Sequence, residues 1–402
     1  MPNMHRASTG LKPEQLVSPG LEDRIFSVVL QLQSPEPTEI PATGGHFAHA
    51  LFLSLVAQVD PVLATELHDR PDYKPFTVSA LNGPLVPSKE RTGYVRLQSQ
   101  SVYWLRFTLL DARLWGSFMS RLLLSGDLPR LRIGPAYFVV CRVMSAPEHT
   151  GTPSGPASGQ DPRQSRKGPW EGWACNCRWS ELVRAVEHRQ RPTLRLPFAG
   201  GRMRIGLRFY SPTAFSLSAH TPGVDPSGLQ SGGGASDDAD DGDPDAADPG
   251  MVIGPEHLQE KSQGRSFPPP VAQPGWGRLG GKRMEVWPRP ELVFGSLART
   301  WSLYSPLALP LDRDELVAMT ADAVVMSRYE LRTQMLQFPK HKQVGFVGYV
   351  IYECVAGGPL AAALDLLADF ALYAGVGYKT TMGMGQTRRM DVEATTGADH
   401  RE

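Results

Sequence analysis

The chain has 402 residues, of which 41% are apolar, so it is long enough to form two domains with packed cores. Its formal net charge is zero, which by itself does not indicate a nucleic-acid partner. The charge is unevenly distributed, because seven aspartates lie between Asp237 and Asp248. Without them the chain carries 41 basic and 34 acidic residues, a net charge of +7, which favours an anionic partner.

Other features exclude whole classes of protein. No apolar run is long enough to span a membrane and no N-terminal pattern resembles a signal peptide, so we expect a cytoplasmic protein. Cys175 and Cys177 form a C-x-C pair, but no second pair or histidine cluster completes a zinc site. Outside the aspartate-rich segment, no carboxylate pair suggests a metal site. We therefore expect neither a metal nor a cofactor.

The first part of the chain, residues 1–150, predicts one βαββαβ unit. Apolar residues recur at helical spacing after a pair of glycines, at Phe47, Leu51, Phe52, Leu55 and Val59. Strands are expected over residues 24–33, 74–81, 101–110 and 131–144, and helices over 46–59, 61–67 and 111–124. This order of elements is that of a ferredoxin-like fold.

The second part, residues 170–398, predicts another unit of the same kind after a linker over 146–169. Helices are expected over residues 179–188, 292–301, 312–322 and 358–374, and strands over 193–198, 203–215, 324–337, 344–354 and 386–392. Residues 218–284 are poor in apolar side chains and rich in Gly, Pro, Ser and Asp, so we expect this acidic insertion to be disordered. The fold class is α+β.

A glycine array lies near the end of the second unit, within Ala374–Arg389. Its glycines are Gly375, Gly377, Gly383 and Gly385, and between and after them stand Tyr378, Lys379, Thr380, Thr381, Arg388 and Arg389. Glycine permits a positive φ and close backbone approach, and successive amides can surround one anion. Lysine, threonine and arginine add donors suited to phosphate. The array therefore predicts a loop that holds a phosphodiester backbone.

Two nucleotide-cofactor interpretations of this array fail on context. A Walker A loop needs a glycine directly before its lysine and a helix after it, whereas Lys379 has neither. A dinucleotide-binding fingerprint needs a strand before the glycines and a helix after them, but here a helix comes first. A glycine-rich turn without any ligand remains open as an alternative.

The array resembles the C-terminal signature of the RAMP superfamily, in particular the CRISPR repeat-processing endoribonucleases. Other segments agree with that family and follow its order: GGHFAHALFLSLVAQVDPVLATELHD, KPFTVSALNG, LRFYSPTAFS and PRPELVFGSLARTW. The resemblance implies two tandem ferredoxin-like domains, with the 218–284 insertion interrupting the second. It also implies that the protein cuts RNA.

The catalytic candidates are histidines, because RNA carries its own nucleophile, the 2′-hydroxyl, and can be cut without a metal. His46 and His49 are expected in the first helical turn, on the face opposite the apolar stripe. His49 matches the family's catalytic context, here His49-Ala50-Leu51-Phe52-Leu53, and His46 rivals it in exposure. A positioned base typically contributes about 10²–10⁴-fold in rate. Lys379 could pair with the scissile phosphate.

Three other features have an ordinary structural interpretation, and two of them also have a functional one. His68 is expected to end a helix and bond nearby backbone. The basic turn at Lys340, His341 and Lys342 could insert beside an RNA stem or could simply be solvated. Tyr103 and Trp104 could stack on bases, although core packing is favoured.

The leading hypothesis is a metal-independent endoribonuclease that cuts CRISPR repeat RNA and leaves a 2′,3′-cyclic phosphate and a 5′-hydroxyl. Its expected partners are the repeat RNA or mature crRNA and other Cas effector subunits, with no membrane and no direct DNA contact. The second hypothesis is a non-catalytic crRNA-binding subunit of a CRISPR effector complex. The third, a general RNA-binding ferredoxin-like module, is weakened because no RNP-type aromatic motif is present.

Overall fold

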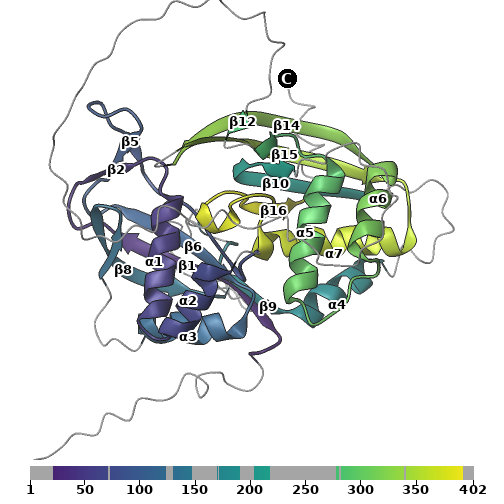
Figure 1. Cartoon of the computed structure of the whole chain (residues 1–402), viewed down its shortest axis with the longest axis horizontal. Helices are drawn as coiled ribbons and strands as arrows, with labels where there is room; N and C mark the ends of the chain where they lie inside the picture. The colour runs from purple at the N-terminus through teal and green to yellow at the C-terminus, as the bar shows by residue number, and fades with distance from the viewer. Residues whose placement is uncertain are drawn as a thin grey trace, which may run out of the picture.

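The computed structural model describes residues 21–70, 73–123, 130–146, 170, 172–190, 203–217, 278–279, 282–338 and 341–392. They form two α+β units, each a twisted antiparallel sheet covered by helices (Figure 1). Within the described residues, no helix is both long and apolar enough to cross a membrane.

The N-terminal unit is built on a sheet with the strand order β3-β6-β1-β8-β7. The strands are β1 (Arg24–Gln33), β3 (Phe76–Val78), β6 (Val102–Leu109), β7 (Arg130–Ile133) and β8 (Ala136–Met144). Helices α1 (Gly45–Ala57), α2 (Pro61–Asp69) and α3 (Ala112–Leu123) complete the unit. The small strands β2 (Glu39–Pro41), β4 (Val86–Pro87) and β5 (Tyr94–Arg96) form a separate sheet. With β1 and β6 adjacent at the centre, this is the ferredoxin-like order.

The C-terminal unit repeats that order with the sheet β14-β15-β10-β16. Its strands are β10 (Met203–Thr213), β14 (Val324–Gln337), β15 (Lys342–Cys354) and β16 (Thr387–Met390). Its helices are α4 (Trp179–Gln190), α5 (Pro290–Tyr304), α6 (Arg313–Ala323) and α7 (Gly358–Ala374). The fold predicted from the sequence, two tandem ferredoxin-like units, is therefore confirmed.

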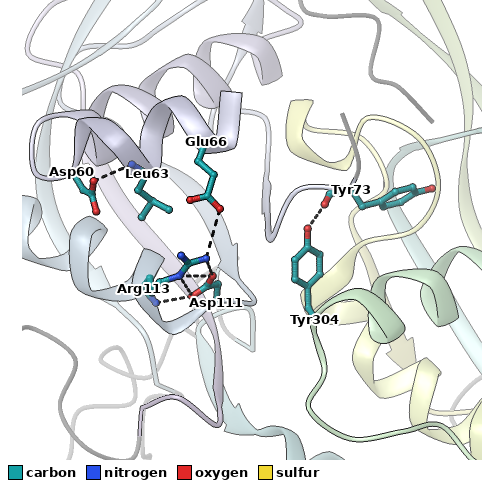
Figure 2. Close-up of polar contacts among 7 residues, drawn as sticks. All are labelled: Asp60, Leu63, Glu66, Tyr73, Asp111, Arg113 and Tyr304. Carbon is teal, nitrogen blue, oxygen red and sulfur yellow. Dashed lines mark hydrogen bonds and ion pairs between the residues drawn. The ribbon is translucent and has the colours of Figure 1, made fainter. Parts of the chain in front are cut away.

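Polar side chains bond at the starts of α2 and α3. Asp60 accepts a hydrogen bond from the Leu63 amide at 2.9 Å at the start of α2. At the start of α3, Arg113 pairs with Asp111 at 2.8 Å and with Glu66 of α2 at 3.9 Å, as Figure 2 shows. These contacts tie α2 to α3 on the outer side of the N-terminal unit.

The two units contact each other directly. The Tyr304 hydroxyl, at the end of α5, donates to the Tyr73 carbonyl of the N-terminal unit (Figure 2). The Arg299 guanidinium lies 4.9 Å from the centre of the Tyr73 ring. Burial raises the pKa of the Tyr73 phenol above its ordinary value. The Tyr73 side chain is half-buried at this contact.

Some sequence expectations were wrong in detail. Residues 131–144 form a hairpin rather than one strand, because Gly134 adopts φ 59° and turns the chain between β7 and β8. The 74–81 strand is reduced to β3. Strand β9 (Cys175–Arg178), which pairs with β1, was not expected.

The 218–284 insertion was also drawn too long. Its last residues belong to strand β13 (Lys282–Glu285), which pairs with β11 (Phe215–Leu217) and β12 (Arg278–Leu279). The other residues of the expected insertion, apart from β12, lie outside the described residues. So do the expected strand at 193–198 and most of the 146–169 linker.

Candidate active site between the two domains

Helix α1 begins directly against the glycine array of the other unit. A Cβ atom added at Gly45 would lie 1.8 Å from the Met382 carbonyl oxygen, far inside contact distance. A Cβ at Gly44, which caps the helix, would meet nothing within 4 Å. Only glycine at position 45 therefore lets the start of α1 and the array approach this closely.

His49 is the point at which a catalytic candidate contacts the array. Its Nδ1 lies 3.1 Å from the Thr381 carbonyl oxygen. Since a carbonyl only accepts, Nδ1 carries the proton, and in the neutral ring Nε2 is left as the basic nitrogen. The ring centre lies 5.6 Å from that of Phe76.

The expected exposure of His49 was wrong. Its side chain is only 4% exposed, and it lies in the second turn of α1 rather than the first. The helix wheel placed it away from the core of its own unit, but the array of the other unit covers that face. A tertiary contact between units, which periodicity within α1 does not record, explains the burial.

Two other histidines lie nearby in the sequence, one on α1 and one on α2. His46 is half-buried in the first turn of α1, with its ring centre 3.9 Å from that of Phe47. His68 is exposed in the last turn of α2, and its backbone carbonyl accepts from the Lys74 ammonium at 3.5 Å. The three histidines thus differ mainly in exposure.

The backbone of the array is folded back on itself. Helix α7 ends at Gly375 with φ 65°, and Gly377, Gly383 and Gly385 also have positive φ. All four glycines are buried. A Cβ at Gly377 would lie 2.4 Å from the Ala214 carbonyl oxygen, and one at Gly385 would lie 2.3 Å from that of Val376. The first consequence of these glycines is the shape of the array itself.

Hydrogen bonds to the end of β10 and to the residue after it occupy two backbone amides of the array. Tyr378 donates to the Ala214 carbonyl at 2.8 Å, and Gly385 donates to the Pro212 carbonyl at 3.1 Å. The half-buried part is the short stretch Tyr378–Thr381, which contains Lys379 in the left-handed conformation at φ 54°. That stretch is the part of the array that faces outward.

Lys379 lies among rings and a sulfur atom. Its ammonium is 3.7 Å from the Met382 sulfur, 5.0 Å from the centre of the Phe338 ring and 5.4 Å from that of Tyr378. Phe338 comes from the end of the β14–β15 hairpin and also stacks on His341, with ring centres 5.0 Å apart. The hairpin therefore reaches the array.

The hairpin reaches the N-terminal unit as well. The Gln337 amide donates to the Thr43 hydroxyl, just before α1, at 3.0 Å. Of the basic turn, Lys342 is exposed at the start of β15, and Lys340 lies outside the described residues.

The two arginines after the array point in opposite directions, as alternation along β16 requires. The Arg388 guanidinium lies 5.0 Å from the centre of the Trp173 ring. Arg389 instead pairs with Asp365 at 2.5 Å and with Asp369 at 3.2 Å, both on α7. Arg388 is thus the arginine on the face of the sheet away from α7.

Arg106 lies on β6 together with Tyr103 and Trp104. All three are buried, so core packing is confirmed for the two aromatic residues. Arg106 donates to Gln386, the last residue before β16, at 2.5 Å and lies 4.7 Å from the centre of the Trp173 ring. Burial lowers its pKa to about 10, so it remains charged at neutral pH.

The array sits where the sequence placed it, with α7 before it and β16 after it. Among the described residues, no group of three or more His, Cys, Asp or Glu side chains could hold a metal ion. The site brings together an imidazole, a lysine ammonium and outward-facing polar residues from two units. Such groups can orient a phosphodiester and move protons.

The comparisons with known families agree with this arrangement. The family described as CRISPR-associated endoribonuclease Cas6 matches residues 268–387. The CRISPR Cas6 N-terminal domain matches residues 25–156. A comparison with curated proteins gives no significant match.

Solved structures of similar fold cover nearly the whole chain. The chain is similar to a product complex of Cas6 from Thermus thermophilus (TTHB231), with a TM-score of 0.57 and 22% identity over 92% of this chain and 100% of that one. A product complex of Cas6 (TTHA0078) has a TM-score of 0.53 and 20% identity over the same shares of the two chains. At these identities the likeness shows the fold.

Proposed function

Because the chain belongs to the Cas6 family of CRISPR-associated endoribonucleases, we propose that it cleaves CRISPR repeat RNA by attack of the 2′-hydroxyl on the adjacent phosphorus, without a metal. The 2′-oxygen forms a bond to phosphorus while the bond from phosphorus to the 5′-oxygen breaks. A base takes the 2′-hydroxyl proton, and an acid supplies one to the 5′-oxygen. The products are a 2′,3′-cyclic phosphate and a 5′-hydroxyl end.

One observation carries this proposal: the contact of 3.1 Å between His49 and the Thr381 carbonyl. It joins a candidate base on α1 to the array expected to bind phosphate. The hydrogen bond fixes the imidazole with its proton on Nδ1, so Nε2 accepts the 2′-hydroxyl proton. His46 is the rival base, since it is less buried.

The array and its surroundings form the proposed RNA-binding surface. Lys379 faces the scissile phosphate, and the outward-facing Tyr378, Thr380 and Thr381 flank it. The glycines shape the backbone around the phosphodiester, and Arg388, Lys340 and Lys342 contact phosphates further along the strand.

Arg389 can also contact a phosphate only if its ion pairs with Asp365 and Asp369 open. The mature crRNA stays bound, available to other Cas subunits.

The test incubates the pure protein with its repeat RNA in excess EDTA. Cleavage should persist, and a substrate with 2′-deoxyribose at the cut site should bind without being cut. Loss of activity that magnesium restores would overturn the metal-independent mechanism.

A panel of three histidine variants assigns the base. We expect His49→Ala to lower the cleavage rate by roughly 10²-fold or more, His46→Ala to lower it less, and His68→Ala to leave it nearly unchanged. His49→Ala also removes a contact between units, so its rate is compared at a temperature at which circular dichroism shows it folded. If the exposed His68 proves essential while His49→Ala cuts normally, the base lies on α2.

The burial of His49 favours one alternative function, a crRNA-binding subunit without activity, because a base that is 4% exposed is shielded from substrate. Tight binding of repeat RNA without cleavage by the wild-type protein would support that alternative.

A further inference from the structure

Arg106 is a buried cation at the junction of the two units, and it is only 1% exposed. From β6 its Nε donates to the Ser27 hydroxyl at 2.7 Å, and its Nη1 donates to the Gln386 side-chain oxygen at 2.5 Å. Its Nη2 donates to the Leu372 carbonyl in the last turns of α7. One guanidinium therefore connects its own sheet to both ends of the glycine array.

Gln386 extends this connection to a second strand of the N-terminal unit. Its side-chain nitrogen donates to the Val78 carbonyl of β3 at 3.1 Å, while its side-chain oxygen accepts from Arg106. Its backbone amide donates to the Ser211 hydroxyl of β10 at 2.9 Å. Since an amide has a donor end and an acceptor end, these contacts set a single orientation of the side chain.

The same cluster holds the middle of the array. Gly383 forms a parallel β-bridge with Ser79. The Ser79 hydroxyl in turn accepts a hydrogen bond from the backbone N–H of Arg106 at 2.9 Å. Gly383 follows Met382, whose carbonyl abuts Gly45 at the start of α1. The array is therefore connected to the backbone of Arg106 through Ser79, as well as to its guanidinium through Leu372 and Gln386.

We propose that Arg106 and Gln386 are positioning residues for cleavage, which hold Lys379 and Thr381 in register with the histidines of α1. This inference rests on the proposed function. Apolar side chains could join two domains without burying a charge, so the charged contact is better suited to specifying one arrangement than to strengthening the interface. The two residues act through the array and do not contact the reacting atoms.

The test removes donor and acceptor together, in the double variant Arg106→Met/Gln386→Met, so that no buried charge is left facing a lost partner. We expect the single-turnover cleavage rate to fall about 10- to 100-fold, as for misplaced catalytic groups. The Kd for the uncleavable 2′-deoxy repeat RNA should change less than threefold. Hydrogen exchange of the peptide that covers the array should become faster.

The matched control is Gln343→Met. Gln343 is also a buried glutamine, 3% exposed, but its side-chain nitrogen donates to the neighbouring Val344 carbonyl within β15. This variant should cut at the wild-type rate. If it loses as much activity as the double variant, the effect is loss of a buried amide in general, and the proposal is overturned.

A second readout separates positioning from general destabilisation. Gly45→Ala separates the array from α1 directly, so combining it with the double variant should cost little more than the larger single effect. Independent structural damage would add instead. An additive result, or a wild-type rate in the folded double variant, overturns the proposal.

If the double variant does not fold, Gln386→Glu replaces it, because a carboxylate keeps an acceptor for Arg106 and turns an acceptor, in place of the donor, toward the Val78 carbonyl. A partial fall in rate is then expected, and a wild-type rate with unchanged exchange of the array contradicts the inference. If the wild-type protein itself does not cut, the proposed function fails. The hydrogen-exchange comparison still decides whether Arg106 and Gln386 hold the array.

Discussion

The two ferredoxin-like units share a strand order but differ in how much of their sheets they cover. In the N-terminal unit, β1 and β6 are buried along almost their whole length. In the C-terminal unit, the central strand β10 is exposed at Arg204, Arg208 and Tyr210, and the edge strand β14 is exposed at most positions. The first sheet is covered by its helices and by the segment around Trp173, which packs on Val29 and Trp104.

The two units therefore contribute different parts to the candidate site, although both have the ferredoxin-like strand order. The N-terminal unit, whose central strands are covered, presents the start of α1 at Gly45. The C-terminal unit extends its β14–β15 hairpin past its own core. The hairpin reaches Thr43, next to the start of α1. Changes where the array meets α1 should therefore affect cleavage, while changes on the outer strand β14 should not.

The largest effect is expected from Gly45→Ala, because the added Cβ would collide with the Met382 carbonyl at 1.8 Å. The array must move away from α1, which should lower the cleavage rate by about 10²-fold and stability by about 1–3 kcal/mol. Single-turnover kinetics and thermal unfolding measure the two. Gly44→Ala is the adjacent control, since its Cβ meets nothing within 4 Å. Equal losses in both variants would mean that the close contact at position 45 has no role.

An intermediate effect is expected from Lys379→Ala. It should weaken RNA binding and reduce the slope of log affinity against log salt by about 0.7–0.9, the release for one phosphate contact. Phe338→Leu keeps the charge and should lower the cleavage rate with little change in that slope. Arg332→Ala removes an exposed cation of β14 and should leave both unchanged. A normal slope in Lys379→Ala would show that the lysine supports only the loop.

A smaller effect is expected from Tyr304→Phe, which removes the hydroxyl that donates to the Tyr73 carbonyl. Stability should fall by about 0.5–1.5 kcal/mol, the usual net contribution of such a hydrogen bond. Denaturant unfolding measures this fall. Cleavage should stay within twofold of wild type, because the contact lies away from α1. A large loss of activity without loss of stability would contradict this view of the interface.

The smallest effect concerns cysteine reactivity. Burial raises the pKa of the Cys177 thiol to about 12, and burial also raises that of Cys175. Few thiolates therefore form at these positions at pH 8, so alkylation should modify the exposed Cys141 first and leave cleavage unchanged. Peptide mass spectrometry reports the order of labelling. Rapid labelling of Cys177 would show that the segment before α4 opens.

Local patterns predicted most elements of this fold. The helix over 358–374 and the strand over 24–33 have the expected bounds, because apolar periodicity within each segment determines them. The helix expected over 312–322 is α6, and Asp312 caps it by accepting from the amides of Asp314 and Glu315. By contrast, β9 is a strand because it pairs with the start of β1, about 150 residues earlier, and no local pattern records that pairing.

The site was predictable only in part. The array and the histidines of α1 were identified from the sequence, and the structure brings His49 and Thr381 into contact. The burial of His49 and the roles of Gly45 and Arg106 were missed, because each depends on a contact between units. A glycine pair before a helix was the only visible signal for Gly45. The assigned roles, like the domain boundaries at 150 and 170, stay predictions.

The contact between Gly45 and Met382 has a consequence for the timing of synthesis. The two residues are more than 300 positions apart, so a ribosome adding about 5–20 residues per second needs roughly 20–70 s to go from one to the other. Throughout that interval the α1 histidines have no array beside them. A nascent chain that has folded its first unit is therefore expected to be inert toward RNA until the second unit has been made.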